Sequence, residues 1–198
     1  VYKRQAEQIL GNSAGLLVLF SVILTAFFSI FKTPVLYAFG ASDATIVYAR
    51  DYISIYLIGT IFVQLALGLN AYISGQGEAK IAMLSVLIGA VLNICLDPLF
   101  IFVLHMGVRG AAVATVLSQA VSAIWVVHFL VSEKSVMRLT LKNMHLKKDV
   151  IKMIAGLGIS PFIMQSTESL VTITLNTGLQ RYGLSLIHIS EPTRHAQI

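Results

Sequence analysis

The sequence contains several long apolar runs, and these constrain the fold more than any other feature. Residues 8–31 include no charged side chain, and a helix of that length crosses the roughly 30 Å hydrocarbon layer of a membrane. Hydrophobic residues make up 57% of the chain and charged residues only 12%. A soluble domain carries about 25% charged residues. The sequence therefore predicts an all-α, polytopic bundle of transmembrane helices.

The two ends of the sequence are predicted to be foreign to the rest. The run that begins Leu184-Ser185-Leu186-Ile187-His188 resembles a translation of the transposase adapter used to build sequencing libraries. The opening residues, Val1-Tyr2-Lys3-Arg4-Gln5, match the other strand of the same DNA. We expect residues 1–5 and 184–198 to be translated adapter DNA, which we call the scars, and exclude them from the fold prediction. The remainder holds 11 basic and 8 acidic residues, a balance that gives no case for nucleic-acid binding.

The remaining apolar segments predict about five spans. Glycine-containing turns and polar stretches separate them, because glycine tolerates the backbone angles that a reversal needs. The predicted spans are residues 8–31, 52–77, 81–104, 111–131 and 150–182.

The connection over residues 132–149 sets the predicted orientation. It is rich in basic residues, and by the positive-inside rule it should be cytoplasmic. Its apolar residues alternate loosely with lysines, which fits either an interfacial segment lying on anionic lipid or a solvated linker. The basic residues in and just after this loop are Lys134, Arg138, Lys142, Lys147, Lys148 and Lys152.

Asp97 is the most informative single residue. It lies in an apolar run, where a carboxylate costs about 2.5–3.5 kcal/mol on insertion scales. Such groups usually face a bundle interior or a wet cavity and mark an ion or substrate path. The alternative is an Asp that only hydrogen-bonds a neighbouring helix and fixes packing.

Polar residues on two adjacent predicted helices fall at matching depths. Asn93 and Asp97 are four residues apart on the third span, and so are Thr115 and Gln119 on the fourth, so each pair shares a helix face. Counted from the short loop between the two spans, Asp97 lies about 10 Å deep and Thr115 about 8 Å deep at a rise of about 1.5 Å per residue. The hairpin therefore predicts a polar cluster.

Pro98 adds a further oxygen to the predicted cluster. Proline has no N–H, so the carbonyl of Ile94 should lose its helical partner. A carboxylate, an amide oxygen, a hydroxyl and a free carbonyl suit Na⁺, or a proton with ordered water, better than zinc or copper. Small residues at spacing four, namely Gly110, Ala114, Ser118 and Ser122, predict a close helix contact beside it.

The chain resembles multidrug and toxic compound extrusion (MATE) transporters over nearly all of residues 6–183. The segments that carry the resemblance are Leu96-Asp97-Pro98, Gly107-Val108, Gly110-Ala111-Ala112-Val113-Ala114-Thr115, Ser118-Gln119, Gly75-Gln76-Gly77 before Lys80, and Gly158-Ile159-Ser160-Pro161 followed by Glu168 and Leu170. Members of the family have twelve helices in two lobes. The resemblance implies that residues 6–131 are helices three to six of the first lobe, 132–149 the cytoplasmic loop between lobes, and 150–183 the first helix of the second lobe.

The resemblance also implies site residues and a function. A cation site of the family would fall on Asn93, Asp97 and Thr115, with Na⁺ as the only metal, and it also uses an Asp on a helix that this sequence lacks. Gln119 and Glu168 are further candidates for cation or substrate contact; Glu168 is equally well an acid satisfied by its neighbours. The expected function is secondary active efflux of lipophilic or cationic drugs in exchange for Na⁺ or H⁺, with no other cofactor, in a cell membrane such as the bacterial inner membrane.

Two alternatives to drug efflux remain at this stage. A flippase for lipid-linked sugars from the same superfamily would favour basic residues in a central cavity, and no predicted span carries an internal Lys or Arg. An integral membrane enzyme would need converging catalytic groups. The three histidines outside the scars, His105, His128 and His145, fall in separate places, which argues against an enzyme.

Overall fold

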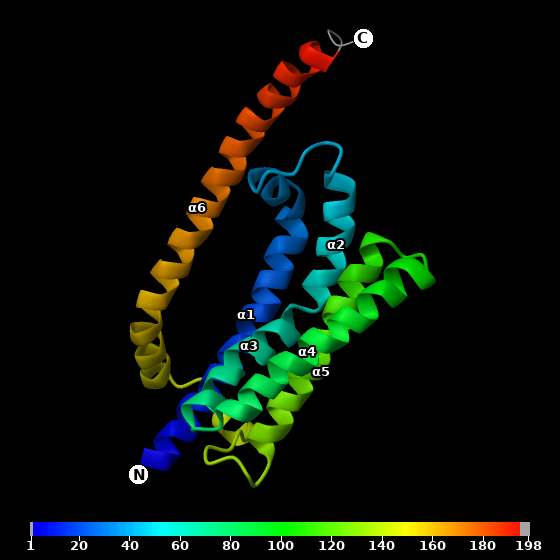
Figure 1. The fold of residues 1–198 in the computed structure, drawn as a ribbon. Coiled ribbons are helices and arrows are strands. Elements are labelled where there is room, and N and C mark those ends of the chain that lie inside the picture. Colours follow the sequence, from blue (N-terminus) through cyan, green and yellow to red (C-terminus); the bar gives the residue numbers. More distant parts are fainter. Residues whose placement is uncertain (1, 195–198) are drawn as a thin grey trace.

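The computed structural model describes residues 2–194, and the regular structure of that part of the chain is all helical, with no β-strand (Figure 1). Four of its helices are long and apolar enough to cross a membrane, and there are five such spans, as predicted, when a bent helix pair is counted as one. The elements are α1 (Tyr2–Ala38), α2 (Ile46–Ile58), α3 (Thr60–Gly75), α4 (Ala79–Pro98), the π-helix η1 (Leu99–Val103), α5 (Val108–Val131), the 3₁₀-helix η2 (Leu141–Met144) and α6 (Lys148–Arg194).

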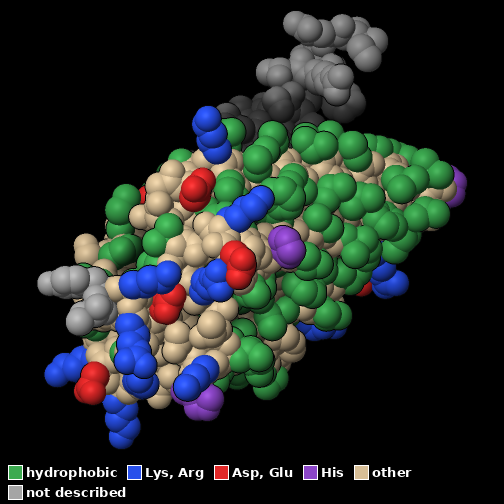
Figure 2. Space-filling view, turned by 90° about the horizontal axis from the view of Figure 1, so that it is seen from below, with side chains coloured by type: hydrophobic (Ala, Val, Ile, Leu, Met, Phe, Trp, Pro, Cys, Tyr) green, Lys and Arg blue, Asp and Glu red, His purple; other side chains and the backbone are tan. Residues whose placement is uncertain are grey.

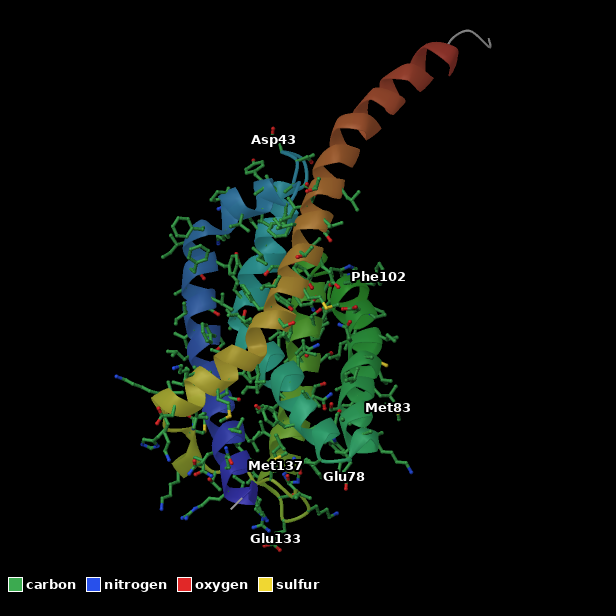
Figure 3. All side chains as sticks on the ribbon, turned by 90° about the vertical axis from the view of Figure 1, so that its left-hand side faces the viewer. Asp43, Glu78, Met83, Phe102, Glu133 and Met137 are labelled. Atoms are coloured by element: carbon green, nitrogen blue, oxygen red, sulfur yellow. The ribbon has the colours of Figure 1, made fainter. Side chains whose placement is uncertain are left out.

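The spans alternate in direction, so the molecule has two distinct ends. Figure 3 places Asp43 and Phe102 toward one end, and Glu78, Met137 and Glu133 toward the other. The second end holds the basic loop that is predicted to be cytoplasmic, and we call it the inner end. Seen from there, lysine and arginine side chains gather over part of the face, while hydrophobic side chains cover much of the rest (Figure 2).

Helix α1 is longer than the apolar run that predicted it. The expectation that the span ends at Lys32 is wrong, because α1 continues through Pro34 to Ala38. Neighbouring helices can compensate for a proline in a membrane helix. Lys32 therefore lies inside a span, where its ammonium donates to Ser54 Oγ of α2 at 2.9 Å. The expectation that no span carries an internal basic residue is wrong for this position.

The second span begins earlier than predicted and is bent. Arg50 and Asp51 belong to α2 rather than to a polar connection, and α2 meets α3 at an angle of 60°. The break is at Gly59, where an added Cβ would lie 2.5 Å from a methyl group of Val116 on α5. The missing side chain lets the chain pass close to α5 at the bend.

The third span changes helix type at Pro98. The α-helix α4 ends there, and the backbone continues as the π-helix η1, in which the Leu104 N–H donates to the Leu99 carbonyl at 3.0 Å. Proline cannot donate to the carbonyl four residues earlier, and π-turns inside helices occur frequently at functional sites. The irregular turn directly follows Asp97.

The connection over residues 132–147, which we call the strap, is docked on the inner ends of three helices. Gln76 Oε1 accepts hydrogen bonds from Ser135 Oγ at 2.9 Å and from the Val136 N–H at 2.9 Å. Asn12, fully buried on α1, accepts from the Lys147 N–H at 2.7 Å. The strap is therefore not a solvated linker, one of the two predicted alternatives.

Helix α6 stands apart from the other helices (Figure 1). Among the residues that the structure describes, α6 contacts α1 and no other element, and its side chains are almost all exposed over residues 148–175. It also continues past the predicted end at Tyr182 to Arg194. The packed part of the molecule is thus α1 to α5 with the strap.

Candidate functional site

The predicted polar cluster forms between α4 and α5. Asn93 Nδ2 lies 3.2 Å from Asp97 Oδ1 on the same helix and 3.5 Å from Thr115 Oγ1 on α5. All three residues are half-buried, whereas the neighbouring Ile94 is 69% exposed. The three side chains that the depth match predicts to lie together do meet in the structure.

The hydrogen-bond directions define what the cluster offers a ligand. The Asn93 amide nitrogen donates to both other members, while the Thr115 hydroxyl donates to the Ala111 carbonyl at 2.9 Å. Within residues 2–194, Asp97 Oδ2 has no hydrogen-bond donor. An oxygen-rich group of this kind, with one carboxylate and two neutral oxygens, suits a hard monovalent cation or a proton. No group of three or more His, Cys, Asp or Glu that could hold another metal is present in the described part of the chain.

Close packing of α5 holds the cluster in place. Gly110, Ala114, Ser118 and Ser122 are all buried, as their spacing predicts. A Cβ on Gly110 would lie 2.8 Å from the backbone of Phe100 in η1, and Ser122 Oγ donates to the Ser85 carbonyl of α4 at 2.9 Å. Because backbone atoms meet at both ends of the contact, α4 and α5 have little freedom to separate.

A cavity with both polar and apolar walls adjoins the cluster on its inner side. Its volume is about 180 Å³, and α3, α4 and α5 all contribute to its wall. Gln119 lines this cavity together with Asn93 and Thr115, so the structure brings it beside the cluster, as its depth predicted. The lining residues are Ala66, Leu67, Ser85, Val86, Gly89, Ala90, Asn93, Thr115, Ser118, Gln119 and Ser122.

The sequence prediction missed the polar role of two residues, Ser85 and Asn70. Ser85 Oγ donates to Asn70 Oδ1 of α3 at 3.1 Å at the inner side of the cavity. Ser85 stands two helical turns before Asn93 on the same face of α4, so the spacing of four from Ser85 through Gly89 and Asn93 to Asp97 could have revealed it. Asn70 lies about as far before the short turn between α3 and α4 as Ser85 lies after it, so counting depth from that turn could have paired the two residues.

The structure does not bring Glu168 to the cluster. This residue lies on α6, its side chain is exposed, and the only contact recorded for it is the hydrogen bond that its backbone carbonyl accepts from Thr172 Oγ1 at 2.9 Å. The described part of α6 contacts neither α4 nor α5. Any partner of the Glu168 carboxylate would come from outside the residues described.

Comparisons with known proteins agree on one family. The MatE family profile matches residues 2–99. The multidrug export protein MepA of Staphylococcus haemolyticus (strain JCSC1435) is 30% identical over 143 residues, which are 72% of this chain and 32% of that protein. The MepA of Staphylococcus aureus (strain MSSA476) is 28% identical over 144 residues, or 73% of this chain and 32% of that protein.

Solved transporters share the fold. An outward-facing multidrug resistance MATE family transporter of the MOP superfamily is 26% identical, with a TM-score of 0.68 over 89% of this chain and 44% of that one. An inward-facing structure of such a transporter is 24% identical, with a TM-score of 0.74 over 85% of this chain and 44% of that one. The chain spans about a third of the length of the curated relatives it matches.

Proposed function

Since the chain belongs to the MATE family of multidrug efflux transporters, we propose that it forms part of a secondary transporter that couples drug export to Na⁺ or H⁺. The expected cargo is lipophilic or cationic small molecules, in line with the multidrug export named for its relatives. The partner lipid bilayer follows from the apolar spans, and a bacterial inner membrane is consistent with the Staphylococcus relatives.

The observation that carries the coupling proposal is the cluster of Asn93, Asp97 and Thr115. A carboxylate within an apolar helix is costly unless it is paired or hydrogen-bonded, and here its described partner is one neutral amide. A monovalent cation or a proton would neutralise the charge. The cluster therefore has a reason to bind the coupling ion that a packing contact alone would not supply.

The geometry suggests how the ion would change the cluster. Asn93 now directs its amide nitrogen toward both oxygens. A bound Na⁺ would require the amide to turn and present its oxygen, so that the carboxylate, the amide and the hydroxyl all become ligands. Such a change ties α4 to α5 differently in the two states. A ligand shifts a conformational equilibrium by its differential affinity for the two states, which is the basis for alternating access.

The two alternative functions are less well supported. The basic residues Lys32 on α1 and Arg50 on α2 fall inside the helices of spans. Lys32 lines an apolar cavity between α1 and α2, and neither residue lines the cavity beside Asp97. The relatives are named as multidrug export proteins, so a sugar-lipid flippase is not favoured. Members of the matching family are transporters rather than enzymes.

The proposal is tested by Asp97→Asn in a full-length transporter that contains this chain. The change keeps the shape and removes the charge. Efflux of a fluorescent lipophilic cation from vesicles, driven by an imposed Na⁺ or proton gradient, should fall to the background of empty vesicles. The amount of protein in the membrane should stay nearly constant. Full gradient-driven efflux by the variant would show that Asp97 only packs.

Removal of the neutral ligands gives a graded control. Asn93→Ala and Thr115→Ala each delete one uncharged oxygen, so they should weaken the dependence on the ion gradient less than Asp97→Asn does. An equal loss in all three variants would indicate a general packing defect rather than ion coupling.

A further inference from the structure

Ser118, in the middle of α5, is a buried hydroxyl without a partner. It is 1% exposed, and its oxygen has no hydrogen bond to any described group. Other buried serines in these helices donate to carbonyls, as Ser122 does to Ser85. Leaving a buried polar group unsatisfied costs about 1–3 kcal/mol, so a partner is expected at Ser118.

A water molecule in the cavity beside Ser118 can be that partner. The cavity wall is largely apolar but also holds polar side chains of α4 and α5, including those of Ser118 and Gln119. At about 30 Å³ per water molecule, a cavity of this size would hold about six waters. Cavities that stay dry in proteins are lined by apolar groups alone, and a buried water needs two to four polar partners. Although much of this wall is apolar, six polar side chains in it can supply such partners.

The cavity extends along α4 and α5 from the cluster toward the inner end. Asn93 and Thr115 lie at its outer end, and Ser85 and Ser122 lie two helical turns further in. Beyond Ser85, the Asn70 side chain continues the polar groups toward the inner end by donating to the Ala82 carbonyl at 3.2 Å. From Asp97 to Ser85 the distance along α4 is about 18 Å, at a rise of about 1.5 Å per residue.

We propose that this cavity holds ordered water bound by Ser118, and that this water is the inner half of the path by which a small monovalent cation or proton reaches the Asn93–Asp97–Thr115 cluster. Hydration of the cavity stands on the buried hydroxyl and the polar lining alone. Its use as an ion path rests on the proposed function.

The lining chemistry suits passage rather than tight binding. All the lining side chains are uncharged, so the fixed negative charge sits only at Asp97, at the outer end. Conduction requires that an ion bind well enough to enter and weakly enough to leave. Neutral hydroxyl and amide groups with water meet that need, whereas a second carboxylate in the cavity would hold the ion back.

Cysteine accessibility tests the hydration of the cavity. Ser118→Cys is placed in the 198-residue chain after Cys95→Ala, reconstituted in vesicles, and treated with a charged, membrane-impermeant methanethiosulfonate. The control is Leu117→Cys, at the same depth, where the native side chain is 43% exposed on the bundle surface and would face lipid. A charged reagent does not enter hydrocarbon, so Ser118→Cys should react at least about tenfold faster than Leu117→Cys.

The labelling has outcomes that decide the proposal. Faster reaction at Ser118→Cys from the inner side supports it, and it should persist with Asp97→Asn because the water does not depend on the ion. Equal reaction at the two positions, or none at Ser118→Cys, overturns it. Ser85→Cys in the same cavity gives the decisive reading if Ser118→Cys does not reach the membrane.

A blocking variant tests the path separately from the function. In the full-length transporter, Ser118→Leu should slow gradient-driven efflux at least about tenfold by filling the cavity. Leu117→Phe adds bulk at the same depth but outside the cavity lining, so efflux by that variant should stay within about twofold of the parent. Normal efflux by Ser118→Leu would overturn the path while leaving coupling at Asp97 intact. If Asp97→Asn loses coupling while the cavity stays hydrated, the efflux of Ser118→Leu alone decides whether the cavity is the ion path.

Discussion

Asp97 and Glu168 are both carboxylates within long apolar helices, yet their surroundings differ sharply. Asp97 is half-buried and takes part in a cluster that joins α4 to α5. Glu168 is exposed on α6, whose described residues contact α1 alone. The comparison teaches that an acid in a membrane helix becomes a candidate site through partners on a second helix at the same depth.

The packing around the two acids differs in the same way. On α5, Gly110 meets the backbone of Phe100 closely, and nothing lies within 4 Å of a Cβ added to Gly156 or Gly158 on α6. The region that holds Asp97 is therefore fixed by backbone contact. The region that holds Glu168 is not fixed by contacts within the residues described.

The largest predicted difference in stability separates two glycine-to-alanine changes. Gly110→Ala should destabilise the chain by about 1–3 kcal/mol, because the added methyl group forces α5 away from η1. Gly158→Ala should stabilise it by as much as about 1 kcal/mol, since alanine is the better helix former and has free space. Chemical unfolding in detergent micelles measures both. If both changes shift the free energy of unfolding in the same direction, the proposed difference in packing between α5 and α6 is wrong.

A smaller effect is expected from a double-mutant cycle on the cluster. Asn93→Ala and Thr115→Ala should be coupled by about 0.6 kcal/mol, the average for hydrogen bonds between membrane helices. The matched pair on α6, Glu168→Ala and Thr172→Ala, should show no coupling, because Thr172 bonds the backbone of Glu168 and not its side chain. Coupling in the α6 pair, or none in the cluster, would contradict the geometry.

The smallest effect is expected at the outer end of α5. Arg109 Nε lies 3.1 Å from Asp51 Oδ2 of α2, and both side chains are substantially exposed. Exposed ion pairs contribute little to stability. Arg109→Ala should leave the unfolding transition unchanged within error, measured beside Gly110→Ala in the same micelles. A loss as large as that of Gly110→Ala would mean that the exposed outer contact, not the backbone packing, positions α5.

The sequence predicted the parts of the structure that depend on short-range register. Asn93, Asp97, Thr115 and Gln119 meet because one short loop fixes α4 against α5, so depth along each helix could be counted from the same point. The small-residue face of α5 followed from its spacing in the same way.

The parts that sequence reasoning missed depend on contacts between distant segments. The bend at Gly59 results from its approach to Val116, and the strap docks because Asn12 and Gln76 happen to face it. The extension of α1 past Lys32 needs Ser54 of another helix as a partner. None of these contacts has a periodic signature in the sequence.

The orientation remains a prediction, and it bears on the proposed inner path. The strap should be cytoplasmic and the loop at Gly107 external. Single cysteines at Val136, which is 58% exposed, and at Gly107 test this in intact cells after Cys95→Ala. An impermeant maleimide should label Gly107→Cys and spare Val136→Cys. The reverse pattern would place the cavity on the outer side of the cluster.

Cation binding by the chain itself tests the central claim most directly. The unfolding temperature of the reconstituted 198-residue chain is measured against Na⁺ at constant ionic strength, with choline as the replacement, and against acidification. A cation that binds the folded state alone stabilises it by mass action. The chain and its Glu168→Gln variant should respond to Na⁺ or to acid, and Asp97→Asn should lose that response. An undiminished response in Asp97→Asn would contradict the assignment of the cation site to Asp97.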